Sequence, residues 1–531
     1  MGLYLLDYGA GNVQSLANSL ARLGHAFRWI STPADFDDAT ILIFPGVGAF
    51  GSAVQSLESR GLRDPLLRYI RSGRPFMGIC IGMQILFQSS SESTLPGLGV
   101  IPCPIEQFDS SDKAVPHIGW NTANLVRHGP AHYYFVHSFC AKYNPDKYPA
   151  AAEWVHSTTQ YGAELFVSSV RRGNVFGTQF HPEKSGAAGL ALLDAWLRNP
   201  GSDAQAPRAA PALQPAHGLT RRIVACMDVR ANDAGDLVVT KGDQYDVRER
   251  AEAVAGQVRN LGKPVALAAR YFAQGADELC LLNITSFRHS PLRDQPMLAV
   301  VRAAAECVFV PLTIGGGIKD TVDPDGTRRS ALEVAGAYFR AGADKVSIGS
   351  EAVYAVERLR AAGKGDGTSA IETIARAYGR QAVVVSVDPR RVYVDPETYD
   401  GPYRDELVAG EGRAWWYQCT VSGGRESRPV SVVELARGVE ALGAGEILVN
   451  SIDRDGTGLG FDLDLLNLVK KNVRVPVIAS SGAGSAEHFV QVFRDSGVEA
   501  ALAAGIFHRD QVGIADVKEA LRTAGINVRV A

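Results

Sequence analysis

The sequence predicts an α/β protein with two parts: a parallel sheet covered by helices, and a (β/α)8 TIM barrel made of two half-barrel repeats. Three observations support this prediction. Short apolar runs alternate with amphipathic stretches along the 531 residues, which is typical of parallel sheets with helices on both faces. A stretch rich in Pro and Ala interrupts this alternation near residue 200. Beyond it, the longer part of the chain repeats itself.

The first part alternates three apolar runs with three amphipathic stretches. In parallel sheets the chemistry lies at the carboxyl ends of the strands, where this part places its glycine-containing turns. We expect strands within 3–9, 41–48 and 75–80, and helices over 12–23, 50–71 and from 81 onward.

Residues 199–218 read NPGSDAQAPRAAPALQPAHG and carry little bulky apolar content. Such a segment buries too little surface to offset the entropy lost on ordering, so we expect a linker. The expected domains are therefore 1–199, a linker over 200–219, and a barrel over 220–531.

The second part contains four pairs of similar segments in the same order. An ordered set of four indicates two half-barrels of four β/α units each, which together close an eight-stranded barrel. The pairs are IVACMDVR (223–230) with VVVSVDPR (383–390), QGADELCLLNIT (274–285) with LGAGEILVNSID (442–453), PLTIGGGI (311–318) with PVIASSGA (476–483), and AGADKVSIGS (341–350) with SGVEAALAAG (496–505).

The composition argues against several classes of function. A formal net charge of −3 gives no general attraction for nucleic acid or anionic membranes. The seven cysteines are widely spaced and match no zinc-site pattern, so we expect no disulfide framework and no structural metal. We also expect no cofactor. No apolar run approaches the roughly 18–20 residues that span a bilayer, and MGLYLLDYGAGN lacks the features of a signal peptide. We therefore expect a soluble, cytoplasmic protein.

Cys80 lies within GICIGMQ (78–84) and has two interpretations. Free cysteines are mostly buried and inert. A glycine two residues away on each side, however, is the pattern of a nucleophile elbow, and a helix that starts after the cysteine would favour its thiolate. The segment FGTQFHPEKSG (176–186) adds His181 as a base and Glu183 as its orienting carboxylate. Together these residues favour a nucleophile.

With these two motifs, the first 199 residues resemble the class I (triad) glutamine amidotransferases. The resemblance implies that the cysteine attacks the side-chain amide of glutamine, that ammonia leaves, and that the glutamyl thioester is hydrolysed. It implies Cys80 as nucleophile, His181 as base and acid, Glu183 as orienter, Val47 and Gly48 of the PGVG turn as oxyanion-hole donors, and Gln84 as a glutamine contact.

Asp228 and Asp388 end equivalent strands of the two repeats, so they should face each other across the barrel mouth. A lone aspartate at a strand end is usually a helix cap, whereas a symmetry-related pair favours a general acid and base. The turns IGGGI (314–318) and SSGAG (480–484) could each simply permit tight turns. As a pair half a barrel apart, they favour a substrate with a phosphate at each end, because such turns bind anions.

The strings ACMDVR (225–230), LTIGGGI (312–318) and SIDRDGTGLGFD (451–462) make the whole chain similar to the bifunctional imidazole glycerol phosphate synthases of histidine biosynthesis. The resemblance implies that ammonia from glutamine reacts with the doubly phosphorylated phosphoribulosyl-formimino-aminoimidazole carboxamide ribotide. The products implied are imidazole glycerol phosphate and aminoimidazole carboxamide ribotide, and the fusion implies a monomer with these small-molecule substrates. The substrate-binding residues implied are Lys241, Gly317, Gly349, Ser350, Asp455, Gly456, Gly482 and Gly505.

Four charged residues near the amino ends of barrel strands have two interpretations. They could stabilise the bottom face as ion pairs, or, as the resemblance implies, form a gate through which ammonia enters the barrel. The four are Arg222, Glu278, Lys345 and Glu446, and the resemblance adds Lys184 and Asp344 as an interdomain salt bridge.

The chain departs from the family pattern at Asn283, where an aspartate is usual, and at Ser481, where a glycine is usual. Three segments are longer than a minimal barrel needs. Two other functions stay open: a related isomerase of two-phosphate sugars, which needs no ammonia, and a phosphosugar-binding scaffold with an inactive glutaminase. An intact cysteine triad counts against both. The longer segments lie near 319–330, 361–370 and 395–413.

Overall fold

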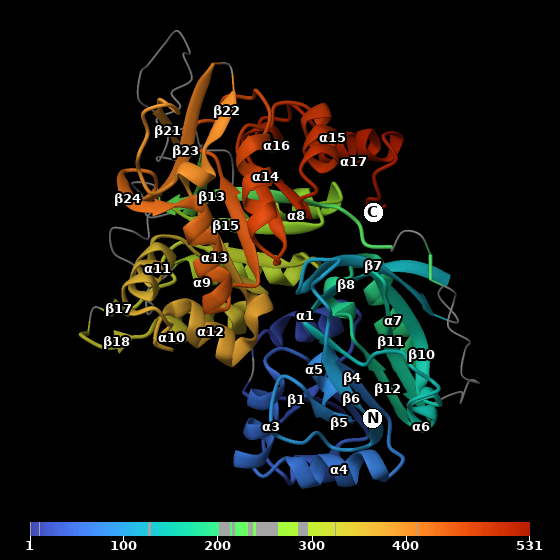
Figure 1. Cartoon of the computed structure of the whole chain (residues 1–531). Coiled ribbons are helices and arrows are strands. Elements are labelled where there is room, and N and C mark those ends of the chain that lie inside the picture. Colours follow the sequence, from blue (N-terminus) through green and yellow to red (C-terminus); the bar gives the residue numbers. More distant parts are fainter. Residues whose placement is uncertain are drawn as a thin grey trace. The chain divides into compact units, whose positions relative to one another are not determined.

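The chain divides into two compact units, residues 1–220 with 376–381 and residues 221–375 with 382–531 (Figure 1). Lys241 lies outside the described residues, as does the expected linker apart from positions 200, 213, 214, 218 and 219. The computed structural model describes residues 2–9, 11–125, 129–200, 213–214, 218–231, 237–240, 264–284, 296–323, 325–410 and 412–530.

The first unit contains short strands and helices in alternation. Its strands are β1 (Leu3–Leu6), β2 (Arg28–Ile30), β3 (Ile41–Phe44), β4 (Phe76–Ile79), β5 (Phe87–Ser90), β6 (Ile101–Gln107), β7 (His117–Leu125), β8 (Gly129–His137), β9 (Phe139–Cys140), β10 (Val155–Tyr161), β11 (Glu164–Arg172) and β12 (Val175–Thr178). Its helices are α1 (Gln14–Arg22), α2 (Asp35–Asp38), α3 (Phe50–Ser59), α4 (Arg63–Arg71), α5 (Ile81–Gln84), α6 (Pro149–Ala152), the 3-10 turn η1 (Pro182–Lys184) and α7 (Gly186–Arg198).

A seven-stranded sheet in the order β10-β11-β12-β4-β3-β1-β2 forms the centre of this unit. The strands from β12 to β2 pair in parallel, while β10, β11 and β12 pair antiparallel. Every residue of β1, β3 and β4 is buried, as in a sheet covered on both faces. The predicted parallel sheet is therefore confirmed.

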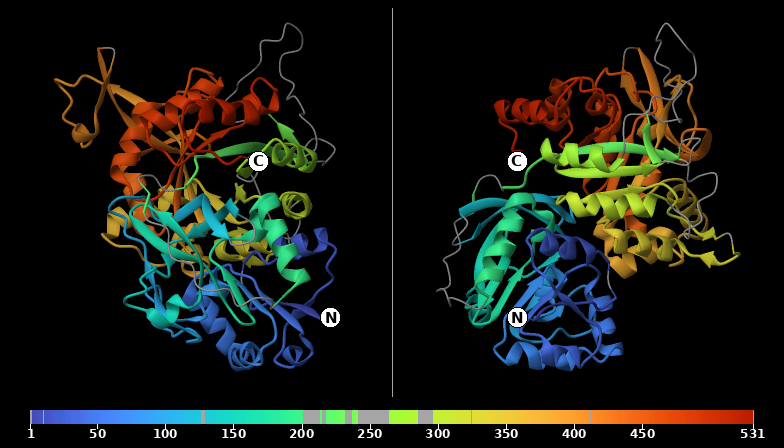
Figure 2. Two further views of the ribbon diagram at one scale, coloured as in Figure 1. Left: turned by 90° about the vertical axis from the view of Figure 1, so that its right-hand side faces the viewer. Right: turned by 180° about the vertical axis from the view of Figure 1, so that it is seen from behind.

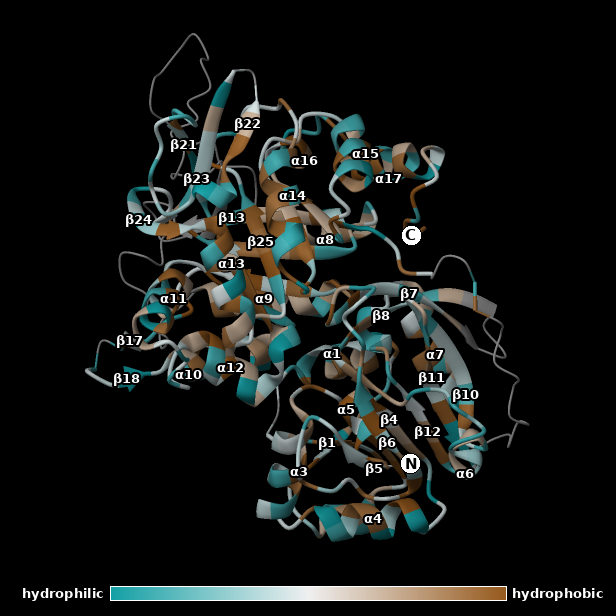
Figure 3. Ribbon diagram, in the orientation of Figure 1, coloured by the Kyte–Doolittle hydropathy of each residue, from teal (hydrophilic) through white to brown (hydrophobic). Residues whose placement is uncertain are grey.

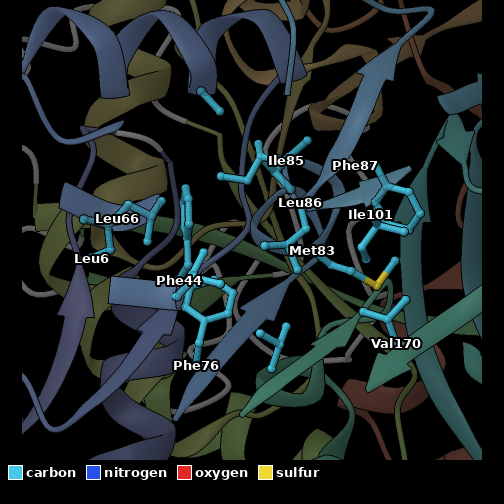
Figure 4. Close-up of a cluster of buried hydrophobic side chains, with 14 of the residues drawn as sticks. Leu6, Phe44, Leu66, Phe76, Met83, Ile85, Leu86, Phe87, Ile101 and Val170 are labelled. Carbon is cyan, nitrogen blue, oxygen red and sulfur yellow. The ribbon is translucent and has the colours of Figure 1, made fainter. Parts of the chain in front are cut away.

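Apolar side chains from strands and helices form the core beside this sheet. Phe44, Phe76 and Met83 come from β3, β4 and α5 and pack in one cluster with Leu66 of α4 (Figure 4). Helix α4 buries Leu66, Tyr69 and Ile70 and carries arginines elsewhere, so it shows both brown and teal segments (Figure 3). This amphipathic pattern is what a helix on a sheet face requires.

Two predicted helices of this unit are shorter than expected. The stretch 50–71 forms α3 and α4 rather than one helix, because the chain turns at Gly61, whose φ of 65° is left-handed. The helix expected from residue 81 ends at Gln84, and the chain continues into β5.

The second part of the chain contains more elements. Its strands are β13 (Arg222–Ala231), β14 (Leu237–Thr240), β15 (Glu278–Asn283), β16 (Leu312–Gly315), β17 (Thr321–Val322), β18 (Arg328–Arg329), β19 (Lys345–Ile348), β20 (Val383–Val387), β21 (Pro389–Val394), β22 (Val408–Gly410), β23 (Arg413–Val421), β24 (Glu426–Ser431), β25 (Glu446–Asn450), β26 (Val477–Ser480) and β27 (Ala500–Ala503). Its helices are α8 (Pro264–Ala273), α9 (Pro296–Cys307), α10 (Ala331–Ala341), α11 (Ser350–Ala362), α12 (Ala370–Tyr378), η2 (Arg380–Ala382), η3 (Arg404–Glu406), α13 (Val432–Leu442), α14 (Leu463–Asn472), α15 (Ala486–Asp495), α16 (Gly505–His508) and α17 (Ile514–Thr523).

Eight parallel strands close into a barrel in the order β13-β15-β16-β19-β20-β25-β26-β27, and β27 pairs back with β13. Figure 2 shows the helices of this unit around the strands. The predicted (β/α)8 barrel is therefore confirmed. Two of the longer segments contain additional antiparallel strands. β17 and β18 pair with each other, and β22 joins the sheet formed by β21, β23 and β24.

Candidate active site

Cys80 lies at the end of β4 on a sharp turn into α5, and its sulfur sits in a buried site. Its φ and ψ of 49° and −106° are strained for a residue with a side chain, as expected of a nucleophile elbow. The flanking glycines are required by close backbone approach. A Cβ at Gly78 would lie 2.3 Å from the Gly82 carbonyl oxygen, and one at Gly82 would lie 2.3 Å from that of Phe44.

His181 and Glu183 lie beside Cys80, in the segment that follows β12. His181 Nδ1 donates to Glu183 Oε1 at 2.7 Å, and the imidazole also hydrogen-bonds the Cys80 sulfur. All three residues are at least 94% buried. Burial opposes the charged imidazolium, but the Glu183 carboxylate and the Cys80 sulfur outweigh it and hold the pKa of His181 well above its ordinary value. The arrangement suits a base that takes the thiol proton and holds it as an imidazolium until a leaving group accepts it.

The glycine turn after β3 approaches the end of β4 closely. A Cβ at Gly46 would lie 1.6 Å from the Ile79 carbonyl oxygen, so only glycine fits. The Val47 N–H, an expected oxyanion-hole donor, lies 3.3 Å from the hydroxyl of Tyr8, and that hydroxyl donates to the Val47 carbonyl at 2.6 Å. Tyr8 was missing from the predicted site, because a tyrosine after the first strand carries no motif. In this state the Val47 N–H is directed to a tyrosine.

Gln84 occupies the last position of α5 and is buried. Its Nε2 donates to the Phe139 carbonyl at 3.0 Å and to Gln179 Oε1 at 2.9 Å. Both N–H groups of the Gln84 amide are therefore directed to protein acceptors. Its Oε1 is the atom that could contact glutamine.

A cavity of about 820 Å³ opens at the carboxyl ends of the barrel strands. Asp228, in the carboxyl-terminal half of β13, and Asp388, directly after β20, both line it. The structure thus brings the two aspartates together with most of the predicted phosphate-binding positions. The predicted residues that line the cavity are Asp228, Gly317, Gly349, Ser350, Asp388, Asp455, Gly456, Gly482 and Gly505.

The three aspartates that line this cavity have raised pKa values. Burial, with a smaller contribution from Asp455, raises the pKa of Asp228 to about 7. Burial also raises the pKa of Asp388, but Asn450 opposes the shift by donating to Asp388 Oδ1 at 2.8 Å. Two carboxyls whose surroundings differ in this way suit a protonated acid and an ionised base.

Asp228→Asn is expected to stabilise the second unit above neutral pH. Because its pKa is raised in the folded state, Asp228 binds its proton more tightly when the protein is folded than when it is unfolded. The stability that Asp228 contributes is therefore present below about pH 4 and is lost as the pH rises through 7, where the buried carboxylate destabilises the folded state. Asparagine removes this penalty, which is at most about 4 kcal/mol. Urea unfolding of both proteins at pH 5 and pH 8 should show the larger gain at pH 8. Equal gains would contradict the pKa assignment.

The cavity also contains residues that the sequence did not identify. Lys319 lies next to the first glycine turn and Arg509 at the end of α16, so each expected phosphate site has a cation nearby. An isolated Lys or Arg after a glycine turn carries no pattern that distinguishes it from a surface charge. Asn450 was missed for a similar reason: its partner, Asp388, is on another strand.

Ser481, which departs from the family pattern, has a φ of 73°, in the left-handed region that favours glycine. Its side chain hydrogen-bonds Asp455, where it opposes the burial that raises the pKa of this carboxyl. The other departure, Asn283, lines the cavity as a neutral side chain.

Four buried charges form a ring at the amino ends of the barrel strands. Arg222 donates to Glu278 at 2.7 Å and to Glu446, while Lys345 lies 2.7 Å from Glu278 and 2.6 Å from Glu446. Burial favours neutral Glu278, but Lys345 and Arg222 outweigh it and lower the pKa of this carboxyl. Between this ring and the mouth lies an apolar interior. Its buried members are Val224, Cys226, Cys280, Val384, Leu448, Ile478, Ala500 and Leu502.

Lys184 and Asp344 lie in different units. Lys184 ends η1, next to Glu183. The Asp344 carboxylate accepts from the Leu312 N–H at 2.8 Å, just before β19. Lys241 lies outside the described residues.

Among the residues that the structure describes, no group of three or more His, Cys, Asp or Glu side chains is arranged to hold a metal ion. Within the same residues, no helix has both the length and the apolar character needed to cross a membrane.

Comparison with known proteins identifies the family of both parts of the chain. Residues 4–198 match the family model of class I glutamine amidotransferases, and residues 222–513 match that of histidine biosynthesis proteins. The imidazole glycerol phosphate synthases hisHF of Emericella nidulans and Schizosaccharomyces pombe are each 52% identical to this chain. The matched regions span 99% of this chain and 98% and 99%, respectively, of the two relatives. The chloroplastic hisHF of Arabidopsis thaliana is also 52% identical, over 99% of this chain and 89% of its own. The chain therefore belongs to the family of bifunctional imidazole glycerol phosphate synthases.

Proposed function

We propose that Cys80 releases ammonia from glutamine in the first unit. In the second unit, Asp228 and Asp388 act as general acid and base in the reaction of this ammonia that forms imidazole glycerol phosphate. The observation that carries the proposal is that each unit has its own set of reactive groups: a strained cysteine with a paired histidine, and two carboxyls in one cavity, one of which accepts a hydrogen bond from Asn450. We assign residues 1–199 to the glutaminase, 200–219 to a linker and 220–531 to the cyclase.

In the glutaminase, His181 takes the proton of Cys80, and the thiolate attacks the carboxamide carbon of glutamine. The imidazolium, stabilised by Glu183, then protonates the departing ammonia. Water, activated by the same imidazole, hydrolyses the thioester to glutamate. Backbone N–H groups of Val47 and Gly48 are assigned to the oxyanion, and Gln84 to the substrate.

In the cyclase, Asp228 donates a proton and Asp388 accepts one while ammonia replaces the amide-bearing portion of the ribotide and the ring closes. A pKa of about 7 keeps Asp228 largely protonated below neutral pH, and the Asn450 N–H stabilises the Asp388 carboxylate. We assign the two phosphates to the glycine turns. One group is Gly317, Gly349 and Ser350, with Lys319; the other is Gly456, Gly482 and Gly505, with Arg509; Lys241 and Asp455 are assigned to the ribotide.

We assign the ring of Arg222, Glu278, Lys345 and Glu446 to the entry of ammonia. An apolar interior beyond the ring favours neutral ammonia over ammonium, because a charge is costly to bury. The Lys184–Asp344 salt bridge is part of the same proposal. So are a monomeric state and a cytoplasmic location, which size-exclusion chromatography and cell fractionation test.

Glutamine hydrolysis with and without the ribotide tests the proposal. We expect slow hydrolysis without the ribotide and a strong increase when it binds. A sugar isomerase would show no ribotide-dependent hydrolysis, and a binding scaffold with an inactive glutaminase would show no hydrolysis at all.

Tyr8→Phe is expected to increase the hydrolysis measured without the ribotide. Loss of the hydroxyl removes the group to which the Val47 N–H is directed, and a freed oxyanion donor should raise the rate by about tenfold. Tyr69→Phe is the matched control, since its buried hydroxyl donates to the Pro75 carbonyl instead. If Tyr8→Phe and the control hydrolysed glutamine at the same rate, the hydrogen bond between Tyr8 and the Val47 N–H would not be what keeps hydrolysis slow without the ribotide.

A further inference from the structure

The glutaminase contains a buried hydrogen-bond chain that the catalytic triad does not use. It runs from the β7–β8 strand pair to the sulfur of Cys80, and all of its side chains are at least 95% buried. Its members are Asn121, His117, His137, the Phe139 carbonyl, Gln84, Gln179 and Cys80.

The Phe139 carbonyl determines the direction of every hydrogen bond in one branch of this chain. A carbonyl oxygen only accepts, so the Gln84 group that faces it at 3.0 Å must be the NH2. The same NH2 faces Gln179 at 2.9 Å, so the facing Gln179 atom must be the oxygen. The Gln179 NH2 is therefore directed to the Cys80 sulfur, 3.5 Å away.

The second branch is directed in the same way. His137 Nδ1 faces the Phe139 carbonyl at 2.8 Å and must carry a proton. Its Nε2 then accepts from His117 Nδ1 at 3.2 Å, and His117 Nε2 accepts from the Asn121 amide at 3.2 Å. Burial, with a smaller contribution from His181, lowers the pKa of His137 to about 3 despite the Phe139 carbonyl, so the ring stays neutral at physiological pH. Both branches thus hold the carbonyl in place.

We propose that Gln179 is a positioning residue of the glutaminase: its amide donates to the Cys80 sulfur, and the Phe139 carbonyl fixes the direction of this donation through Gln84. The inference rests on the proposed role of Cys80 as nucleophile. A neutral donor at the sulfur favours the thiolate over the thiol, in addition to the imidazolium. The same amide keeps Gln84 oriented toward the glutamine site.

Three titratable groups also face the thiol, directly or through a neighbour. His181 hydrogen-bonds it, Glu183 lies behind His181, and Tyr8 approaches it from the segment after β1. Gln179→Met leaves all three in place and removes the amide with little change in side-chain length. The variant therefore isolates the donor.

The test is the pH dependence of Cys80 alkylation by iodoacetamide in the full-length chain, with the modified peptide identified by mass spectrometry. Gln179→Met should shift the alkylation profile to higher pH by about one unit, a tenfold slower reaction at neutral pH. Gln179→Glu, which keeps the acceptor for Gln84 but not the donor, should shift it at least as far. Gln88→Met, at an exposed position on β5, is the matched control and should leave the profile unchanged.

Circular dichroism and the urea unfolding transition of the full-length chain, compared with the unsubstituted protein, report whether the glutaminase of each variant is folded. An unchanged alkylation profile in both folded Gln179 variants would overturn the inference, whether or not glutamine hydrolysis is lost. Cys80→Ala separates this failure from failure of the proposed function: if that variant keeps glutamine-dependent turnover, the role of Cys80 itself is wrong.

Discussion

Replacing Cys80 with alanine should reduce glutamine-dependent formation of imidazole glycerol phosphate by about a thousandfold or more, while cyclisation with ammonium salt continues. The large effect follows from the role of the residue, since no nearby group can replace the thiolate as nucleophile. The barrel should be unaffected, because its strands close without any contribution from β4. Product formation with each nitrogen source, measured on the same preparation, checks both statements.

Cys103→Ala is a suitable control for this experiment. Cys103 is also buried in the glutaminase, but burial raises the pKa of its thiol to about 11, so it is a poor nucleophile at neutral pH. This variant should keep both activities. Loss of the ammonium-dependent reaction in Cys80→Ala would contradict the two-site model, because the two units would then share one site.

Motifs in which function requires a particular backbone could be predicted from the sequence. The glycines around Cys80 are necessary because backbone atoms of α5 and β3 lie within contact of their Cα positions. Asp228 and Asp388 occupy equivalent positions in the two half-barrel repeats. This equivalence predicted two carboxyls in one cavity, because equivalent strands of a closed barrel end on the same face. Such features are local or periodic, so one sequence is enough to reveal them.

Contacts between distant segments could not be predicted in this way. Tyr8 and Val47 meet only because β1 and β3 are neighbours in the sheet, and Gln84 meets Gln179 only because β4 pairs with β12. The length of α5 depends on tertiary structure as well. The chain after Gln84 is apolar enough to continue as a helix, but it pairs as β5 with β6.

Replacing Asp388 with asparagine should reduce cyclisation by about 10²- to 10⁴-fold with glutamine and with ammonium salt alike, because a general base is lost from the reaction itself. Asparagine has nearly the same shape and can still bond Asn450, so the cavity should keep its form. Glutamine hydrolysis in the presence of the ribotide should continue if the ribotide still binds. The measurement is product formation with each nitrogen source, together with glutamate release.

Comparison with Cys80→Ala distinguishes a defect in ammonia supply from a defect in cyclisation. The cysteine variant separates the nitrogen sources, whereas the Asp388 variant should not, since ammonia of either origin reaches the same carboxyl pair. Asp395→Asn, at an exposed position just after β21, is the control for a neutralised aspartate in the same part of the chain. If Asp388→Asn lost only the glutamine-dependent reaction, the carboxyl would act on delivery of ammonia rather than on ring closure, and Asp228 alone would have to supply both proton transfers.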